Sequence, residues 1–143
     1  TYNIPGLGCA AAIIPDPQLR AQFQDQEAGL VSGIGPLNIV ASETAFNDRS
    51  NWLEGLLAQL RSNVQKLEQV VGTRMTPVEA TYLAWVNIAD LAINEVEAHF
   101  EAHGLGISDG AQFGHPDYIR FNFACPDELL TEGLQRLGRA LSA

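Results

Sequence analysis

The sequence Gly106-Ile-Ser-Asp-Gly-Ala-Gln-Phe-Gly114 is followed, after three residues, by Tyr118-Ile-Arg-Phe-Asn-Phe-Ala-Cys-Pro126. Because side chains alternate along a strand, the second segment predicts an apolar face with Ile119, Phe121 and Phe123, and an opposite face with Tyr118, Arg120, Asn122 and Ala124. A guanidinium held among apolar neighbours is costly to desolvate unless an anion meets it. Arg120 is therefore expected either to receive a carboxylate or phosphate, or to lie on a wet strand face paired with one of the chain's acids.

The two segments together, GISDGAQFG and YIRFNFACP, resemble the C-terminal signature of fold-type I pyridoxal-phosphate enzymes. More narrowly, they resemble the group of class I/II aminotransferases and cystathionine β-lyase-like C–S lyases. In that family the arginine of an R-x-N-x-x-x-P pattern binds the α-carboxylate of the amino-acid substrate. The resemblance implies this role for Arg120, with Tyr118 and Asn122 as further candidates for the substrate pocket.

The segment Tyr2-Asn-Ile-Pro-Gly-Leu-Gly-Cys9 carries a second resemblance. It is similar to the family's S-K-T-[FY]-N-I-x-G-L motif, whose lysine forms the Schiff base with pyridoxal phosphate. The resemblance implies that this lysine lies immediately before Thr1 and that the chain is the C-terminal part of such an enzyme. The cofactor would then be bound mostly by the N-terminal half, and the 143 residues alone are expected to be inactive.

The chain contains a single lysine, Lys66, within a predicted helix over Asn51–Gly72. Helical spacing gives that helix an apolar stripe, which consists of Leu53, Leu56, Leu57, Leu60, Val64, Leu67 and Val71. Its opposite, polar face holds Gln59, Ser62, Asn63, Lys66 and Gln69. A lysine on a solvated face stays protonated at neutral pH and is a poor imine former, so Lys66 is expected to be a surface residue.

The rest of the chain alternates between apolar runs and helical patterns, which predicts a small α/β or α+β layer of helices over a sheet. Residues 9–14 read as a buried strand, residues 29–35 as a mobile connection, and residues 81–86 as a strand similar to the family's T-Y-L-A-W segment, although Asn87 stands where an aspartate is common. Helices are expected from Pro17, with Leu19 and Phe23 one turn apart, over 36–46, over 90–103 with Ile93, Val96 and Phe100 inward, and from Pro126 onward.

The resemblance divides this pattern into domains. Residues 1–48 would be the end of the large cofactor-binding domain, residues 49–72 an interdomain helix, and residues 73–143 the small C-terminal domain of a pyridoxal-phosphate-dependent transferase fold. Such enzymes are generally homodimers.

Composition excludes several classes of function. A net charge of −9 disfavours nucleic acid as a partner, and no apolar run approaches the ~20 residues of a membrane span, so a cytoplasmic protein is expected. Cys9 and Cys125 lie in apolar stretches and read as reduced core thiols.

The histidines and aromatic residues predict no metal site and no ligand platform. His99 and His103 are four apart on one predicted helix, but the pattern is not H-E-x-x-H, so they are expected on a solvated helix face with no metal. His115 is expected to face water. Tyr82, Trp85, Phe113, Tyr118, Phe121 and Phe123 could form a stacking platform, but such residues are more often core.

The family resemblance therefore implies an enzyme acting on amino acids. Aminotransfer is placed first because it is the broader class, with C–S β-elimination as the alternative. A second alternative, from another class, is a non-catalytic α/β module for binding or dimerisation.

Overall fold

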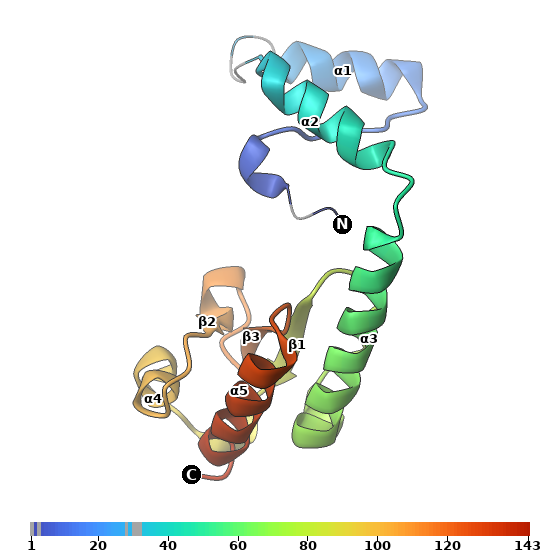
Figure 1. Ribbon diagram of the computed structural model, residues 1–143. Helices are drawn as coiled ribbons and strands as arrows, with labels where there is room; N and C mark the ends of the chain where they lie inside the picture. Colours follow the sequence, from blue (N-terminus) through green and yellow to red (C-terminus); the bar gives the residue numbers. More distant parts are fainter. Residues whose placement is uncertain (1, 3, 28, 30–32) are drawn as a thin grey trace. The chain divides into compact units, whose positions relative to one another are not determined.

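The computed structural model describes residues 2, 4–27, 29 and 33–143 (Figure 1). The chain folds as two compact units, Thr1–Leu53 and Glu54–Ala143. The first is helical in its described part, and the second combines helices with a three-stranded sheet.

The first unit contains two helices that begin at prolines. They are α1 (Pro17–Glu27) and α2 (Pro36–Phe46), preceded by a short 3₁₀ turn, η1 (Pro5–Leu7). Proline suits the first turn because the amide it lacks would have no helical partner. Asp16 completes the start of α1, since its Oδ1 accepts hydrogen bonds from the amides of Gln18 and Leu19. Both predicted helices are confirmed.

The predicted buried strand at residues 9–14 is wrong. The segment has no strand pairing, and Ile13 is 90% exposed. Cys9 is likewise exposed rather than a core thiol. A strand needs a neighbour for its backbone hydrogen bonds, and the described part of the first unit supplies none. Of the predicted connection at 29–35, residues 30–32 lie outside the described residues.

The second unit is built on an antiparallel sheet of order β1-β3-β2. Its strands are β1 (Leu83–Asn87), β2 (Ser108–Asp109) and β3 (Tyr118–Asn122). Its helices are α3 (Trp52–Val71), α4 (Val96–Ala102) and α5 (Asp127–Ala140), with 3₁₀ turns η2 (Gly72–Arg74), η3 (Ala89–Leu91) and η4 (Gly110–Phe113). The predicted mixed fold class is confirmed.

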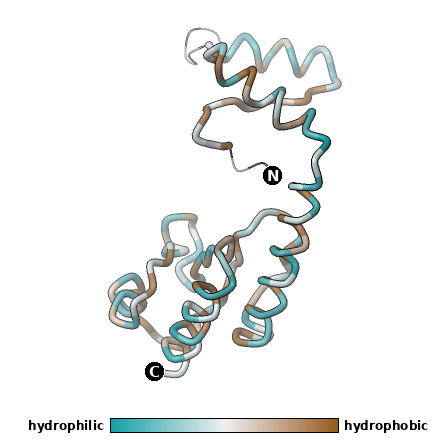
Figure 2. Tube along the Cα trace, in the orientation of Figure 1, coloured by the Kyte–Doolittle hydropathy of each residue, from teal (hydrophilic) through white to brown (hydrophobic). Residues whose placement is uncertain are grey.

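One face of the sheet forms the core of this unit. Alternate residues of β1 and β3 are buried, as the strand pattern predicts. They pack with α3 and α5, whose hydrophobic and hydrophilic segments alternate along the chain (Figure 2). The buried core residues from these four elements are Leu67, Val71, Ala84, Val86, Ile119, Phe121, Leu130, Leu134, Leu137 and Ala140. The alternate side chains of β1 and β3, on the opposite face of the sheet, are not part of this core.

Two details of the helices differ from the sequence prediction. Asn63, expected on the polar face of α3, is fully buried, while Leu57 from the apolar stripe is 37% exposed. The helix predicted over 90–103 is confined to α4, because Ala92 adopts a left-handed backbone (φ 48°) that interrupts helical hydrogen bonding. Gly104 ends α4 with φ 75°, and Val96 and Phe100 face the core as predicted.

Candidate functional site

Arg120 lies in the middle of β3, the central strand of the sheet. Its register partners are Trp85 on β1 and Ser108 on β2. Residues directly opposite each other in antiparallel strands project to the same face. A row of three side chains therefore crosses the sheet on the face opposite the core, with Arg120 at its centre.

Two groups contact the Arg120 guanidinium. Its Nη2 donates a hydrogen bond to Ser108 Oγ at 3.1 Å, and its Cζ lies 4.5 Å from the centroid of the Phe113 ring, in cation–π range. The side chain is half-buried. Ion pairs in the described part of the chain are Lys66–Asp127, Arg74–Asp90 and Arg136–Glu132. No described carboxylate pairs with Arg120.

Four aromatic side chains, the aromatic cluster, gather beside Arg120: Trp85, Phe113, His115 and Tyr118. The rings of Trp85 and Tyr118 stack at 5.5 Å and 10°, and the rings of Phe113 and His115 each make a T-shaped contact with Trp85 at about 6 Å. Phe121 and Phe123 are buried in the core instead. The predicted set of aromatic residues thus divides between the two faces of the sheet. His115 is exposed, as expected, although its ring contacts the cluster.

The turn between β2 and β3 places Phe113. Asp109 Oδ1 accepts from the amide of Ala111, and the amide of Gly114, at φ 80°, donates to the carbonyl of Ala111. Gly110 is buried at the base of this turn, where a methyl group would overlap the carbonyl oxygens of His115 and Tyr118. Only glycine allows the backbone to approach these carbonyl groups so closely, so the conformation of the turn depends on Gly110.

The other candidate pocket residues have separate surroundings. Tyr118 is half-buried against Trp85. Asn122 is exposed at the end of β3, where its Oδ1 accepts from the amide of Ala124 at 2.9 Å and closes a local turn. Neither makes a hydrogen bond to Arg120 among the described contacts.

Lys66 is not placed as a cofactor-binding lysine would be. Its side chain is 36% exposed on α3 and pairs with Asp127 on α5. Cys125 is half-buried rather than fully in the core, and burial raises the pKa of its thiol, which keeps it protonated at neutral pH. Neither residue offers a nucleophile.

His99 of α4 and His103 just after it make structural hydrogen bonds rather than facing solvent alone. His99 Nε2 donates to the carbonyl of Ala140 at 2.8 Å, and His103 Nδ1 donates to the carbonyl of His99 at 2.8 Å. Both are half-buried, which corrects the expected solvated face. Within the described residues no group of three His, Cys, Asp or Glu side chains could hold a metal. None of the described helices is both long and apolar enough to cross a membrane.

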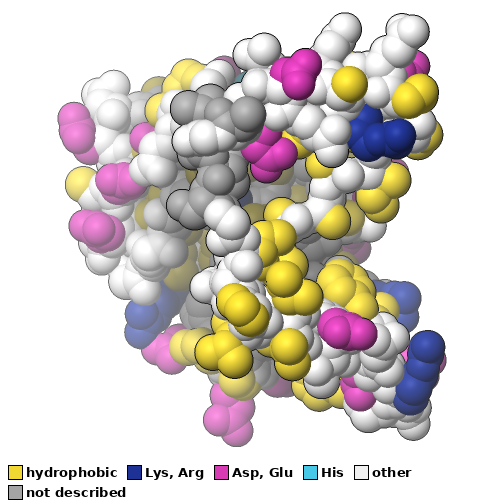
Figure 3. Space-filling model, turned by 90° about the horizontal axis from the view of Figure 1, so that it is seen from above, with side chains coloured by type: hydrophobic (Ala, Val, Ile, Leu, Met, Phe, Trp, Pro, Cys, Tyr) yellow, Lys and Arg dark blue, Asp and Glu magenta, His cyan; other side chains and the backbone are white. Residues whose placement is uncertain are grey.

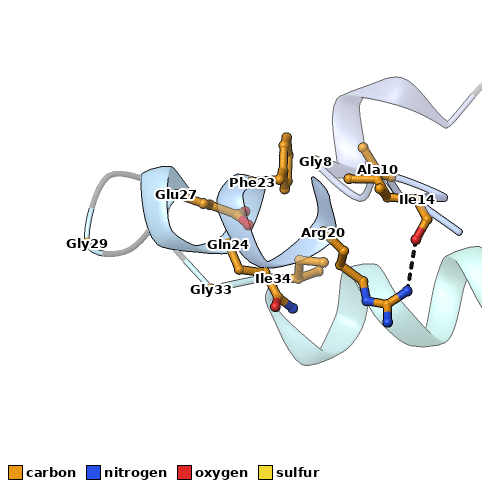
Figure 4. A pocket seen from close by; sticks show the side chains of 11 residues that line it. Gly8, Ala10, Ile14, Arg20, Phe23, Gln24, Glu27, Gly29, Gly33 and Ile34 are labelled. Carbon is orange, nitrogen blue, oxygen red and sulfur yellow. Dashed lines mark hydrogen bonds between the residues drawn. The ribbon is translucent and has the colours of Figure 1, made fainter. Parts of the chain in front are cut away.

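A separate hollow lies in the first unit, between α1 and the segments beside it (Figure 4). Arg20, Phe23, Gln24 and Glu27 of α1 line it, and Arg20 Nη1 donates to the carbonyl of Ile14 at 2.8 Å. Its arginine is thus already engaged by the backbone. The hollow is open, and its walls include Phe23, which is 47% exposed.

Sequence reasoning missed two contacts of the site. Ser108 belongs to the quoted signature, but the sequence assigns it no role because the pairing of β2 with β3 is not visible there. Phe113 is expected among the core aromatics, yet it is 45% exposed. Its position in a glycine-bounded turn, away from any strand, was the signal that it does not follow the core pattern.

Nearly the whole chain matches the model of one known protein family. The model of the family described as aminotransferase class I and II matches residues 1–137. The match includes both segments that carry the resemblance in the sequence.

Individual proteins are similar over the same length. Cystathionine beta-lyase PatB of Bacillus subtilis (strain 168) is 29% identical over 154 residues, which cover 99% of this chain and 40% of that protein. Among solved structures, OvoB is 41% identical with a TM-score of 0.87, covering 99% of this chain and 38% of that chain. A PLP-bound C-S lyase from Staphylococcus hominis, complexed with the inhibitor L-cycloserine, is 28% identical with a TM-score of 0.72, covering 90% and 34%. This chain spans 40% of the length of the curated relatives it matches.

Proposed function

Because this chain belongs to the aminotransferase class I and II family, we propose that it is the C-terminal part of a pyridoxal-phosphate-dependent enzyme that acts on amino acids. Arg120 binds the α-carboxylate of the substrate. In this proposal Tyr118, which stacks on Trp85, and Asn122, at the end of the same strand as Arg120, line the edge of the substrate pocket.

The observation that carries the proposal is the state of the Arg120 guanidinium. A guanidinium has five N–H donors, and one described hydrogen bond, to Ser108, uses one of them. The side chain is half-buried and no described acid neutralises it. A planar guanidinium with free donors matches the two oxygens of a carboxylate in a bidentate, charge-assisted contact.

C–S bond cleavage is the reaction that the comparisons favour. The curated relatives are named as cystathionine beta-lyases, and one similar structure is that of a C-S lyase. In β-elimination the substrate loses its α-proton and expels a thiolate from the β-carbon, which takes up a proton to give a thiol. Water then hydrolyses the unsaturated amine that remains to ammonia and a keto acid. Aminotransfer is the second candidate, since the family model bears that description and the two reactions share the same carboxylate contact.

The described residues fit the substrate side of such a site but not the attachment of the cofactor. The chain's single lysine, Lys66, is paired with Asp127 on a helix surface, so we place the imine-forming lysine and the main cofactor contacts in a part of the protein outside these 143 residues. Pyridoxal phosphate, when bound, supplies an electron sink for the negative charge left on the substrate's α-carbon.

Arg120 contributes orientation to this chemistry. Holding the carboxylate at two oxygens fixes the rotation of the amino acid about its α-carbon. That rotation decides which bond of the α-carbon is aligned for cleavage. The Phe113 ring, whose centroid lies 4.5 Å from Cζ, covers one side of the guanidinium.

We also propose that the full-length enzyme is a homodimer and that its domains divide as the family resemblance implies. We assign residues 1–48 to the end of the large domain, residues 49–72 to the interdomain helix and residues 73–143 to the small domain. Several large apolar side chains of the first unit are exposed, which supports the proposal that this unit packs against a further part of the protein or a second subunit. Hydrophobic side chains gather on the surface shown in Figure 3. These side chains are Ile13, Leu19, Phe23, Leu37, Ile39, Val40 and Phe46.

An absorbance scan of the full-length protein tests the assignment. We expect a visible imine band that shifts when an amino acid is added, and release of a thiol and ammonia from a cystathionine-like thioether substrate. Release of a keto acid that depends on a second keto acid as amino acceptor, without thiol, would favour aminotransfer. A folded full-length protein with no imine band would contradict both and favour a non-catalytic binding or dimerisation module.

A further inference from the structure

Phe113 occupies a position that core packing does not explain. It is a large aromatic side chain, 45% exposed, in the η4 turn rather than in a strand or helix. Its described contacts are the ring of Trp85 and the guanidinium of Arg120. Burial of apolar area therefore gives this residue little reason to be aromatic, whereas a ring face under a cation does.

The backbone around Phe113 is constrained on both sides. Gly110 lies against the carbonyl oxygens of His115 and Tyr118, and the left-handed Gly114 closes the turn after Phe113. Asp109 caps the start of the turn through the amide of Ala111. The backbone path therefore fixes where the Phe113 side chain leaves the turn, and the described contacts of its ring are with Trp85 and Arg120.

Ser108 contacts the same guanidinium from another direction. It is the register partner of Arg120 on β2, and its Oγ accepts from Nη2. A hydroxyl satisfies one donor without neutralising the charge, so four of the five N–H groups remain without a partner among the described contacts. An acid at this position would occupy the guanidinium instead.

We propose that Phe113 and Ser108 are positioning residues that hold the Arg120 guanidinium ready to receive a carboxylate. The proposal rests on the proposed function, since it presumes that Arg120 binds the substrate carboxylate. Phe113 fixes the plane of the guanidinium and Ser108 fixes its rotation within that plane. A side chain that is ordered before binding loses less conformational freedom when the ligand arrives, so carboxylate affinity depends on both contacts.

The test measures protection of Arg120 from an arginine-selective reagent in the full-length protein. Phenylglyoxal modifies accessible guanidinium groups, and propionate is used as the carboxylate probe. Peptide mass spectrometry reports modification at Arg120 and at Arg61, an exposed arginine of α3 that serves as the internal reference. The propionate concentration that halves the modification rate of Arg120 is compared among variants.

We expect Phe113→Leu to raise this concentration about fivefold, because ordering the freed guanidinium adds to the cost of binding. Phe113→Tyr keeps a ring face and should stay within about twofold. Ser108→Ala should raise it about threefold, and Ser108→Thr, which keeps the hydroxyl, should restore it. Ser108→Ala changes few atoms, so it gives a result even if Phe113→Leu does not fold. Circular dichroism spectra establish that the variants compared are folded.

Two outcomes separate the proposals. If propionate does not protect Arg120 in the unsubstituted protein, the proposed carboxylate site is wrong and the positioning roles are wrong with it. If propionate protects Arg120 equally in the unsubstituted protein, Phe113→Leu and Ser108→Ala, the carboxylate site stands and the positioning roles are overturned. Loss of protection in Phe113→Tyr as large as in Phe113→Leu would also overturn the role of the ring face.

Discussion

The side-chain amide of Asn63 donates a hydrogen bond to the carbonyl oxygen of Phe123, 60 positions further along the chain, at 2.8 Å. The same nitrogen donates to the carbonyl of Cys125 at 3.1 Å, and Asn63 Oδ1 accepts from Gln59. One buried residue of α3 thus satisfies two backbone acceptors just beyond the strand that carries Arg120. The end of β3 is tied to α3 at this point.

Replacing Asn63 should loosen β3. Asn63→Ala leaves two carbonyls without their donor and creates a small void, so we expect a loss of about 2–3 kcal/mol. Native-state hydrogen exchange of the β1–β3 amides in the full-length protein measures this loss, as exchange that is ~30- to 150-fold faster. Gln65→Ala, on an exposed position of the same helix, is the control and should leave exchange nearly unchanged. Equal exchange in the two variants would refute the role of Asn63.

Arg120 is expected to dominate recognition of the amino-acid substrate. Removing one partner of a desolvated ion pair costs about 2–5 kcal/mol, so Arg120→Ala should lower kcat/KM by ~10²- to 10³-fold. Arg120→Lys should also fail substantially, because a point charge cannot reproduce the planar fork. Steady-state kinetics of the full-length enzyme measure both, with Arg61→Ala as the charge-matched control. A loss of less than about fivefold in Arg120→Ala would rule out the assignment.

Gly106, just before β2, and Gly110, in the turn between β2 and β3, provide a matched pair. A methyl group at Gly110 would overlap the carbonyls of His115 and Tyr118, so we expect Gly110→Ala to destabilise the second unit by about 1–3 kcal/mol. Gly106 has no heavy atom within 4 Å of an added Cβ, and Gly106→Ala should stay within about 0.5 kcal/mol. Hydrogen exchange of the β3 amides compares the two variants. Similar exchange rates would mean that the turn accommodates the methyl group.

The Arg74–Asp90 pair should make stability depend on pH. Arg74 donates from both Nη atoms to the Asp90 carboxylate and holds the pKa of that carboxyl below its ordinary value. A lowered pKa contributes stability that is present above the unfolded pKa of about 3.9 and is lost as the pH falls through the folded pKa. We therefore expect Asp90→Asn to lower Tm at pH 7 and to have no effect at a pH below both values.

Glu79→Gln is the control for this pH dependence. Glu79 is exposed, and its substitution removes one negative charge, as Asp90→Asn does, without breaking a described ion pair. Thermal unfolding of the full-length protein at several pH values checks both variants. A Tm difference for Asp90→Asn that persists unchanged in strong acid would show that the effect is not electrostatic.

Local patterns predicted much of the fold. The alternation of Ile119, Arg120 and Phe121 fixed which strand face is buried, because period-two burial depends only on the segment itself. The helices that begin at Pro17 and Pro36 followed for the same reason. The short signature around Arg120 was enough to indicate the family that the comparison then identified.

Nonlocal pairing accounts for the features that the sequence did not reveal. The apolar run Cys9–Ile14 looks like a strand, but strand formation depends on a neighbour that the described first unit does not contain. Asn63 lies on the polar side of a helical wheel, yet it is buried because two carbonyls from a segment 60 residues away meet it there. The contact of Ser108 with Arg120 depends on a strand register that residue spacing does not fix.

The turn around Gly110 also indicates how the site can be re-engineered. Its backbone path allows no side chain at Gly110, while Ala111, Gln112 and His115 are exposed, although the His115 ring also contacts Trp85. A saturation library should therefore randomise these three rim positions and retain Gly110 and the length of the turn. We expect selection from such a library to change the specificity of the proposed carboxylate site while the Arg120 guanidinium keeps its place.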